Sequence, residues 1–348
     1  MKSTLKVADG QVTVAYEQRI CVRCVLPESF PGVEFDDLGV CTYCADESER
    51  IEIDRGLITA AVAEAKAAAE GGNYDALVLY SGGKDSSLAL ARTVGLGLRT
   101  LAFTLDNGYL SNAAGRNVAN VLDALGVDHV RFRPPGGLMK RLYRTSLDLR
   151  FDDDTIKYST GGCGSCISMV LASAVRTAAA HGIPLLVGGW TPGQFTTSPV
   201  VDQPFLVDVM SRHFAPLGEA SEELRRDLES WHPDRLGVDG IRLLNPLYAE
   251  DYTEQQTLDA LAELGWRRPD DTDSCSTNCR LNGLLILDHI ERFGFHPYVY
   301  ELAHHVRIGA SSREEALAKM AKVDIKSSQV EAISVDLGIP SVLDAKRR

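Results

Sequence analysis

The sequence predicts an α/β fold, in which a doubly wound parallel sheet follows a zinc ribbon and precedes a helical C-terminal region. Apolar runs alternate with helix-like runs from residue 74 onward, as in βαβ units. Two C-x-x-C pairs lie near the N-terminus, and a helix-like run lies near the C-terminus. We therefore expect the zinc ribbon at 15–48, the α/β domain at 49–250 and the helical region at 251–348.

The strands and helices of the α/β domain follow one another along the chain. An apolar run at 74–80 is typical of a buried parallel strand, and a helix-like run begins at Asp85. An alanine- and glutamate-rich segment, 51–70, is expected to be a helix that leads into the domain. The remaining elements are predicted to be strands at 97–105, 127–132 and 183–187, and helices at 111–125, 167–181 and 280–293.

The turn after the first strand, S-G-G-K-D-S, has the composition of an anion site. Gly82 and Gly83 allow a phosphate to approach the backbone, and Lys84 adds a positive charge. The start of the next helix directs free N–H groups and the positive end of its dipole at one point. Ser81 and Ser86 supply hydroxyl donors. The spacing differs from that of the common P-loop, G-x-x-x-x-G-K-[ST].

This hexapeptide resembles the pyrophosphate loop of the PP-loop ATP pyrophosphatases, which have an adenine nucleotide alpha hydrolase-like fold. The resemblance implies that the loop binds the β,γ-pyrophosphate of ATP with Mg²⁺, while a substrate oxygen attacks the α-phosphate. Lys84 and Asp85 would be catalytic. Asp106 is a candidate because ligands of such sheets bind at the carboxyl ends of strands. The alternative is an ordinary solvated aspartate at a strand end. The predicted nucleotide-binding residues are Ser81, Gly82, Gly83, Lys84, Asp85, Ser86, Asp106, Gly188 and Gly189.

Four cysteines near the N-terminus have the spacing of a zinc site. C-V-R-C and C-T-Y-C are separated by sixteen residues. Two such pairs form a tetrahedral thiolate site, for which Zn²⁺ is the usual metal, and the metal stabilises a module that has little core of its own. The alternative is a set of reduced, metal-free thiols. The predicted ligands are Cys21, Cys24, Cys41 and Cys44.

The other four cysteines lie where helices are predicted to begin. Cys163 and Cys166 follow two glycines and open one helix, and Cys275 and Cys279 lie just before another. A helix N-terminus favours the thiolate form of a cysteine. Eight cysteines in a cytosolic chain indicate metal or redox chemistry rather than disulfides. These four therefore indicate an iron–sulfur site, a second zinc or a persulfide couple, with buried, idle thiols as the alternative.

Two families share the order of these motifs. Over nearly the whole chain, the sequence resembles the N-acetyl sugar amidotransferases of surface-polysaccharide synthesis, through C-V-R-C-V-L-P-E-S-F-P-G, S-G-G-K-D-S, T-L-D-N-G and F-G-F-H-P-Y. This resemblance implies that an acetamido carbonyl is adenylated and that ammonia then replaces its oxygen. The ammonia would come from a separate glutaminase subunit, since the chain has no evident glutaminase domain.

The second resemblance covers fewer residues. S-G-G-K-D-S, a later C-x-x-C and a further cysteine pair are similar to the pattern of the iron–sulfur-dependent thiolases of tRNA 2-thiolation. This resemblance implies that Cys163, Cys166 and either Cys275 or Cys279 hold a 4Fe–4S cluster that carries sulfide. The late pair departs from the thiolase pattern, because it is C-x-x-x-C rather than C-x-x-C.

The presence of the late pair favours ATP-dependent sulfur transfer. Amidotransfer and a non-catalytic nucleotide-binding protein are the alternatives. The implied partner is a sulfur donor such as a cysteine desulfurase, or a glutaminase. The net charge of −12 favours a small molecule or a sugar nucleotide over tRNA as the acceptor. No apolar run is long enough to span a bilayer, so we expect a cytoplasmic protein without a membrane segment.

Overall fold

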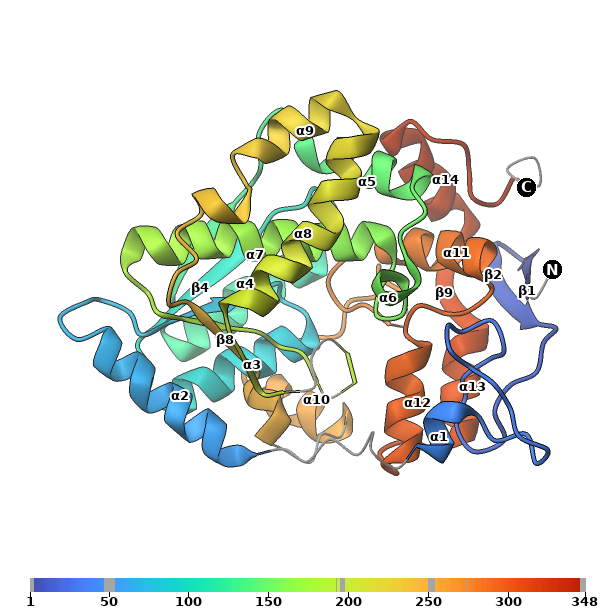
Figure 1. The fold of residues 1–348 in the computed structure, drawn as a ribbon, viewed down its shortest axis with the longest axis horizontal. Helices are drawn as coiled ribbons and strands as arrows, with labels where there is room; N and C mark the ends of the chain where they lie inside the picture. Colours follow the sequence, from blue (N-terminus) through green and yellow to red (C-terminus); the bar gives the residue numbers. More distant parts are fainter. Residues whose placement is uncertain are drawn as a thin grey trace.

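The centre of the molecule is a six-stranded sheet with the order β5-β4-β3-β6-β8-β7 (Figure 1). Strands β5, β4, β3, β6 and β8 run parallel, and β7 pairs with β8 antiparallel. The predicted mostly parallel sheet is therefore confirmed, with one antiparallel strand at its edge. The computed structural model describes residues 3–46, 54–191, 193–194, 198–249, 254–273 and 275–344.

The elements of the sheet domain match most of the predicted runs. The predicted strands correspond to β3 to β6, and the helix predicted at 51–70 corresponds to α2, with 51–53 outside the described residues. The strands are β3 Ala76–Leu79, β4 Thr100–Leu105, β5 Asp128–Phe132, β6 Leu185–Val187, β7 Val200–Val201 and β8 Arg242–Leu244. The helices are α2 Arg55–Ala68, α3 Lys84–Gly95, α4 Asn112–Leu125, α5 Leu138–Asp148, α6 Asp153–Ile156, α7 Gly161–His181, α8 Gln203–Ala220, α9 Glu222–Glu229 and α10 Glu254–Glu263, with 3-10 turns at Pro233–Arg235 and Pro246–Ala249.

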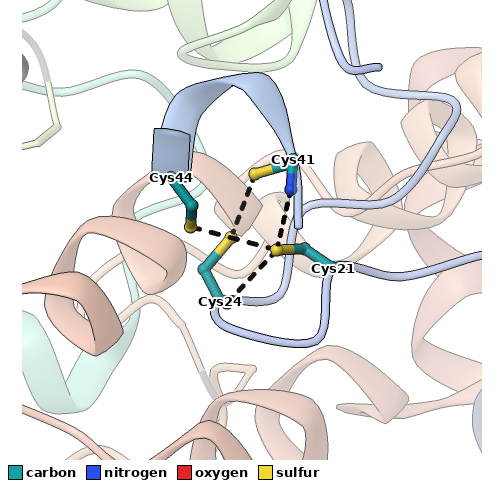
Figure 2. Close-up of side chains that lie close together, drawn as sticks. All are labelled: Cys21, Cys24, Cys41 and Cys44. Carbon is teal, nitrogen blue, oxygen red and sulfur yellow. Dashed lines mark hydrogen bonds between the residues drawn. The ribbon is translucent and has the colours of Figure 1, made fainter. Parts of the chain in front are cut away.

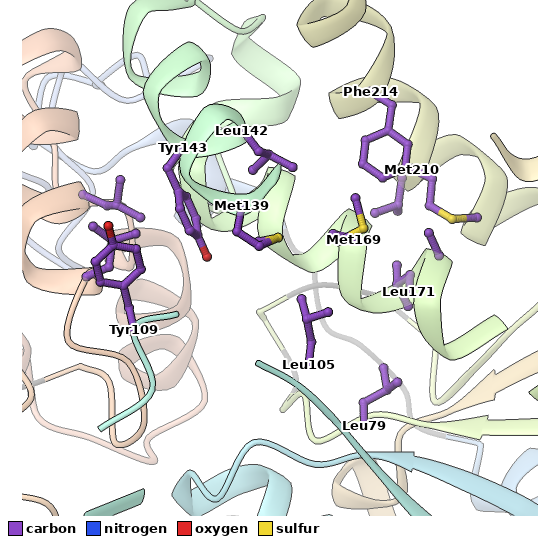
Figure 3. Close-up of a cluster of buried hydrophobic side chains, with 14 of the residues drawn as sticks. Leu79, Leu105, Tyr109, Met139, Leu142, Tyr143, Met169, Leu171, Met210 and Phe214 are labelled. Atoms are coloured by element: carbon purple, nitrogen blue, oxygen red, sulfur yellow. The ribbon is translucent and has the colours of Figure 1, made fainter. Parts of the chain in front are cut away.

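Helices cover both faces of the sheet. Leu77 and Leu79 belong to a core cluster with residues of α5, α7 and α8, and Figure 3 shows part of this layer. Ala76 and Val78 belong to a second cluster, with residues of α2, α3 and α4. Successive strand residues point to opposite faces, so a strand buried on both faces is apolar throughout. Because helices cover both faces of the sheet, a site can form only among the loops at the carboxyl edge of its strands.

Helix α7 crosses the middle of this core. It is the one helix in the described part of the chain that is long and apolar enough to cross a membrane. Its most apolar window is 56% buried inside the protein, and it packs against β3, β4 and β6 as well as α5 and α8. This packing is that of a core helix, and its apolar composition follows from burial.

A second, three-stranded sheet joins the N-terminal hairpin to the C-terminal region, in the order β1-β2-β9. The region 251–348, expected to be helical, contains the strand β9 as well as helices. The sequence K-V-D-I-K buries Val323 and Ile325 and exposes the charged residues between them, which is the alternation of a strand. The elements are β1 Ser3–Ala8, β2 Gln11–Tyr16, β9 Lys322–Lys326, α11 Asn282–Phe293, α12 Val299–Arg307, α13 Arg313–Ala321 and α14 Ser327–Leu337.

The N-terminal cysteine module packs on the C-terminal helices, although the two are far apart in sequence (Figure 1). Its four cysteines and Phe30 share a core cluster with Phe295 and with residues of α12 and α13. The Arg313 guanidinium donates to the main-chain oxygens of Cys21 and Cys24, with Nε 2.8 Å from the latter. The predicted domain boundaries near 49 and 250 lie outside the described residues, so the division into domains stays a prediction.

Candidate metal centre and active-site cavity

Cys21, Cys24, Cys41 and Cys44 are all buried, and their sulfur atoms lie within 4.8 Å of one another (Figure 2). The Sγ atoms of Cys21 and Cys44 are 3.9 Å apart, and those of Cys24 and Cys41 are 3.7 Å apart. A tetrahedron with Zn–S bonds of about 2.3 Å has sulfur atoms about 3.8 Å apart. The four cysteines, which we call the knuckle, can therefore bind a metal such as zinc.

Backbone N–H groups surround the knuckle sulfurs. The N–H groups of Arg23, Cys24 and Cys41 point at Cys21 Sγ, with N–S distances of 3.4, 3.5 and 3.3 Å. The N–H of Leu26 lies 3.4 Å from Cys24 Sγ. Such donors stabilise thiolates in a buried place, because they offset charge that water cannot reach. The donor set thus fits a thiolate-bound metal.

The S-G-G-K-D-S turn joins β3 to α3, and close packing shapes its two glycines. Gly82 has φ of +76°, and a Cβ there would lie 2.5 Å from the carbonyl oxygen of Ala114. Gly83 is the N-cap of α3, whose first residue is Lys84. The indole N–H of Trp266 donates to the carbonyl oxygen of Gly82 over 2.9 Å. Position 82 therefore requires glycine, because the surrounding backbone leaves no space for a side chain.

The polar side chains of this turn form a compact set. The hydroxyl oxygens of Ser81 and Ser86 are 3.1 Å apart, and Ser86 also donates to the carbonyl oxygen of Gly83. Lys84 Nζ lies 2.6 Å from the carboxylate of Asp85. At the end of β6, a Cβ on Gly189 would lie 2.8 Å from the backbone of Ser86. The strand end after β6 thus packs directly on the turn.

A cavity of about 680 Å³ opens beside this turn. The strand order reverses between β3 and β6, and in doubly wound sheets ligands bind at that point. The cavity therefore lies where the topology predicts a ligand. Its lining includes six of the predicted nucleotide-binding residues and all four cysteines of the second group: Ser81, Gly83, Lys84, Asp85, Ser86 and Gly189, together with Cys163, Cys166, Cys275 and Cys279.

The second group of cysteines is spread around the cavity wall. The amide nitrogen of Asn107 lies 3.8 Å from Cys166 Sγ and 3.6 Å from Cys279 Sγ, so both thiols meet one polar group. Cys163 donates to the side-chain oxygen of Asn282 over 3.3 Å. Among the described residues, the knuckle is the one group whose ligand atoms lie as close together as a single ion needs. A multi-iron cluster spaces its cysteine ligands more widely.

Burial reverses the thiolate character expected at these helix starts. Cys163 and Cys166 lie within the first turns of α7, which begins at Gly161, rather than before it. Burial raises the pKa of the Cys163 and Cys166 thiols, and it raises the pKa of Cys279 to about 11. The helix dipole is too weak to offset this desolvation. The protein alone therefore holds neutral thiols, which a bound metal would deprotonate.

Asp106 does not line the cavity, although it ends β4 as predicted. Its carboxylate lies 2.8 Å from the guanidinium groups of Arg131 and Arg133. Burial alone would raise the pKa of Asp106, but the N–H of Gly108 and the two arginines lower it. The next residue, Asn107, lines the cavity in its place. Gly82 and Gly188 also lie outside the lining and act through packing.

The cavity wall contains residues that sequence patterns did not predict. Glu301 of α12 accepts a hydrogen bond from Gln194 Nε2 over 2.7 Å. Burial and the charge of Asp85 raise the pKa of Glu301 to about 7. Beside the cysteines, burial raises the pKa of Asp273 to about 6, and Asp273 accepts from the amide of Asn282. Asp273 lies outside the lining, whereas Glu301 and Gln194 belong to it and reach the site only through the tertiary fold, so no motif marks them.

Comparisons with known proteins leave the family open. No family model matches the chain. An uncharacterised protein of Methanocaldococcus jannaschii is 25% identical over 265 residues, which cover 76% of this chain and 78% of that protein. A solved structure described as a predicted subunit of a tRNA methyltransferase from the same organism covers 65% of this chain and 91% of its own. Its identity is 16% and its TM-score 0.31, too low to bear on fold or function.

Proposed function

We propose that this chain is an enzyme that uses ATP to adenylate a carbonyl oxygen of a small molecule and then replaces that oxygen with sulfur. One observation carries the proposal: the S-G-G-K-D-S turn and four cysteines line the same cavity. A phosphate fits the turn, because the start of α3 presents N–H groups and Lys84 presents a positive charge. A sulfur carrier on the same wall would lie close to the activated carbon.

In the first step, the carbonyl oxygen of the substrate forms a bond to the α-phosphorus of ATP, and pyrophosphate leaves. Lys84 would neutralise the pyrophosphate, and Mg²⁺ would share its charge. The cavity carboxylates of Asp85 and Glu301 are oxygen ligands of the type that Mg²⁺ prefers. In the second step, hydrosulfide attacks the activated carbon, the C–O bond breaks, and the oxygen leaves on AMP.

The residues that would hold an iron–sulfur cluster are Cys163, Cys166 and either Cys275 or Cys279. Their donor set fits, since all four thiols face one cavity and an amide lies beside two of them. When bound, a 4Fe–4S cluster with one open iron would supply a carrier for sulfide. A fourth cysteine ligand would close that position, so one of the late pair should stay free.

Amidotransfer is the second candidate, and the extent of the motif similarity supports it. Ammonia needs no metal at the activated carbon, and the motif order similar to that of N-acetyl sugar amidotransferases extends over most of the chain. A glutaminase would then be the partner. Both candidates share the adenylation step and differ only in the nucleophile.

We further propose that the knuckle holds a structural Zn²⁺. The sulfur–sulfur distances of 3.7 and 3.9 Å suit a single ion. All four ligands are cysteines and all are buried, which leaves no open coordination position for a substrate. The metal would therefore stabilise the N-terminal module and take no part in the reaction.

Anaerobic purification followed by metal and sulfide analysis tests the choice of nucleophile. Sulfur transfer predicts a brown protein with zinc, iron and acid-labile sulfide. Cys163→Ala should remove the colour and the iron but keep the zinc, whereas Cys21→Ser should do the reverse. A colourless anaerobic protein with zinc alone, which converts a UDP-N-acetylhexosamine with ATP and ammonium, would establish amidotransfer. ATP binding without pyrophosphate release with either nucleophile would leave a non-catalytic nucleotide-binding protein.

A further inference from the structure

One side chain connects the loop of the late cysteines to the phosphate-type turn. The backbone N–H of Lys84 donates to Thr277 Oγ1 over 2.8 Å. Thr277 lies midway between Cys275 and Cys279, and its hydroxyl is 3.2 Å from the place of a Cβ on Gly83. A residue almost two hundred positions away thus caps the start of α3.

The N–H of Lys84, which donates to Thr277, is one to which an anion at this helix start would bind. The first N–H groups of a helix have no partner within the helix, and an anion at a helix start binds to them. Lys84 is the first residue of α3, and the N-cap Gly83 has no side chain with which to cap it. The hydroxyl of Thr277 therefore lies where an oxygen of a bound phosphate would accept from this N–H.

A phosphate oxygen is the stronger acceptor. A hydrogen bond to an ionised acceptor is roughly twice as strong as one between neutral groups. Thr277 is neutral, and within the part of the chain that the structure describes its hydroxyl bonds only to the N–H of Lys84, while the loop has other anchors. The N–H of Ser111 donates to the carbonyl oxygen of Asn278 over 2.8 Å, and that of Arg280 donates to the carbonyl oxygen of Tyr109 over 3.0 Å. On the other side, the N–H groups of Cys275 and Ser276 donate to the carboxylate of Asp273, so a displaced Thr277 would free the middle of the loop and leave both ends attached.

We propose that Thr277 is a positioning residue that couples nucleotide binding to the cysteine loop, because pyrophosphate displaces its hydroxyl from Lys84 and loosens the middle of the loop 275–279. This inference rests on the nucleotide site of the proposed function. The loop carries Cys275 and Cys279, while Cys163 and Cys166 lie on helix α7. Nucleotide binding therefore acts on the segment that carries one cysteine pair and leaves the helix that carries the other in place.

Pyrophosphate with Mg²⁺ is a sufficient probe, and its binding to the full chain can be measured by calorimetry. Thr277→Val keeps the shape of the side chain but removes the acceptor, so it should bind pyrophosphate about two- to tenfold more tightly than the wild type, since one competing hydrogen bond is gone. Thr277→Ser keeps the hydroxyl and should restore wild-type affinity. Thr93→Val removes a buried hydroxyl from the far part of α3 and serves as the matched control.

Hydrogen exchange of the peptide that contains residues 275–279 gives a second readout. In the wild type, pyrophosphate should speed exchange there by about threefold or more, as expected for release of a local contact. In Thr277→Val, exchange should already be fast and should not respond to pyrophosphate. Weaker binding by Thr277→Val, or exchange that pyrophosphate slows, would overturn the coupling and make Thr277 a direct phosphate ligand. A wild type that binds no pyrophosphate would instead refute the nucleotide site itself.

Discussion

Phe30 of the knuckle module stacks on Tyr300 of α12, with ring centroids 5.8 Å apart and ring planes within 6° of parallel. Tyr300 also lines the cavity, where its ring meets that of Tyr158 edge-on at 5.3 Å. Tyr43, which precedes the last knuckle cysteine, contacts Tyr300 from another side. One aromatic cluster thus runs from the metal centre to the cavity wall, and a change at either end can reach the other.

Cys21→Ser should abolish metal binding at the knuckle. A serine oxygen is a poorer ligand for zinc than a thiolate, and three remaining sulfurs leave an open coordination position. Zinc content should fall from about one per chain to near zero, and the melting temperature should fall with it. Cys275→Ser changes a cysteine outside the knuckle and should keep the zinc. The prediction fails if freshly purified wild-type protein contains no zinc.

Arg313→Met should destabilise the protein by about 1–3 kcal/mol, because it leaves buried carbonyl oxygens of the knuckle without donors. Arg313 donates to the main-chain oxygens of both Cys21 and Cys24, so a single substitution removes all three of these bonds between α13 and the knuckle backbone. Methionine keeps most of the apolar stem. Urea unfolding measures the effect, with Arg226→Met at an exposed ion pair as the control. Equal losses in the two variants would contradict the role of Arg313.

Lys84→Ala should slow release of AMP and pyrophosphate by about 100-fold or more, as expected when a charge that stabilises a transition state is removed. The melting temperature should stay within a few degrees of the wild type, because Lys84 is the first residue of α3 and its side chain pairs with the neighbouring Asp85 rather than with the core. Lys140→Ala removes an exposed lysine of α5 and should leave the rate unchanged. Isotope-labelled ATP distinguishes the products, and formation of ADP and phosphate would exclude adenylation.

Glu301 should make stability depend on pH. Its pKa is 4.5 in an ordinary setting and about 7 in the folded protein. Between these values the folded state binds more protons than the unfolded state, so this group lowers stability as the pH rises through that window and has no further effect above it. Glu301→Gln cannot ionise and still accepts a bond from Gln194.

The difference in unfolding free energy between Glu301→Gln and the wild type should therefore rise from pH 4.5 to pH 7 and then level off, which urea unfolding at several pH values can measure. Glu222→Gln should show no such rise, because Arg225 lowers the pKa of the exposed Glu222 carboxyl. A difference that is constant across this range would show that Glu301 ionises normally.

Local patterns predicted the parts of the fold that are locally determined. Strands β3, β4 and β6 are apolar runs buried on both faces, and helices come after β3 and β4 in the sequence, so composition alone marks these elements. Strands β7 and β8 have two and three residues, too few to show a period. The sheet β1-β2-β9 depends on pairing between the two ends of the chain, which no local window contains.

The same distinction applies to the candidate site. The knuckle ligands and the S-G-G-K-D-S turn were predicted because their chemistry lies within a few consecutive residues. Asn107, Thr277 and Glu301 were missed because they come from three separate segments and meet only in the folded cavity. Asp106 lies at a strand end as predicted, but it does not line the cavity, and its carboxylate pairs with Arg131 and Arg133 of the neighbouring strand and its loop.

The pairing of β2 with β9 also sets an order for biosynthesis. Gln11 pairs with Lys326, so β2 has an unpaired edge until nearly the whole chain has left the ribosome. At a synthesis rate of about 5–20 residues per second, this interval is roughly 15–60 s. An exposed strand edge can pair with other chains during that time. Cover for this edge during synthesis, from a chaperone or another segment of the chain, would prevent such pairing.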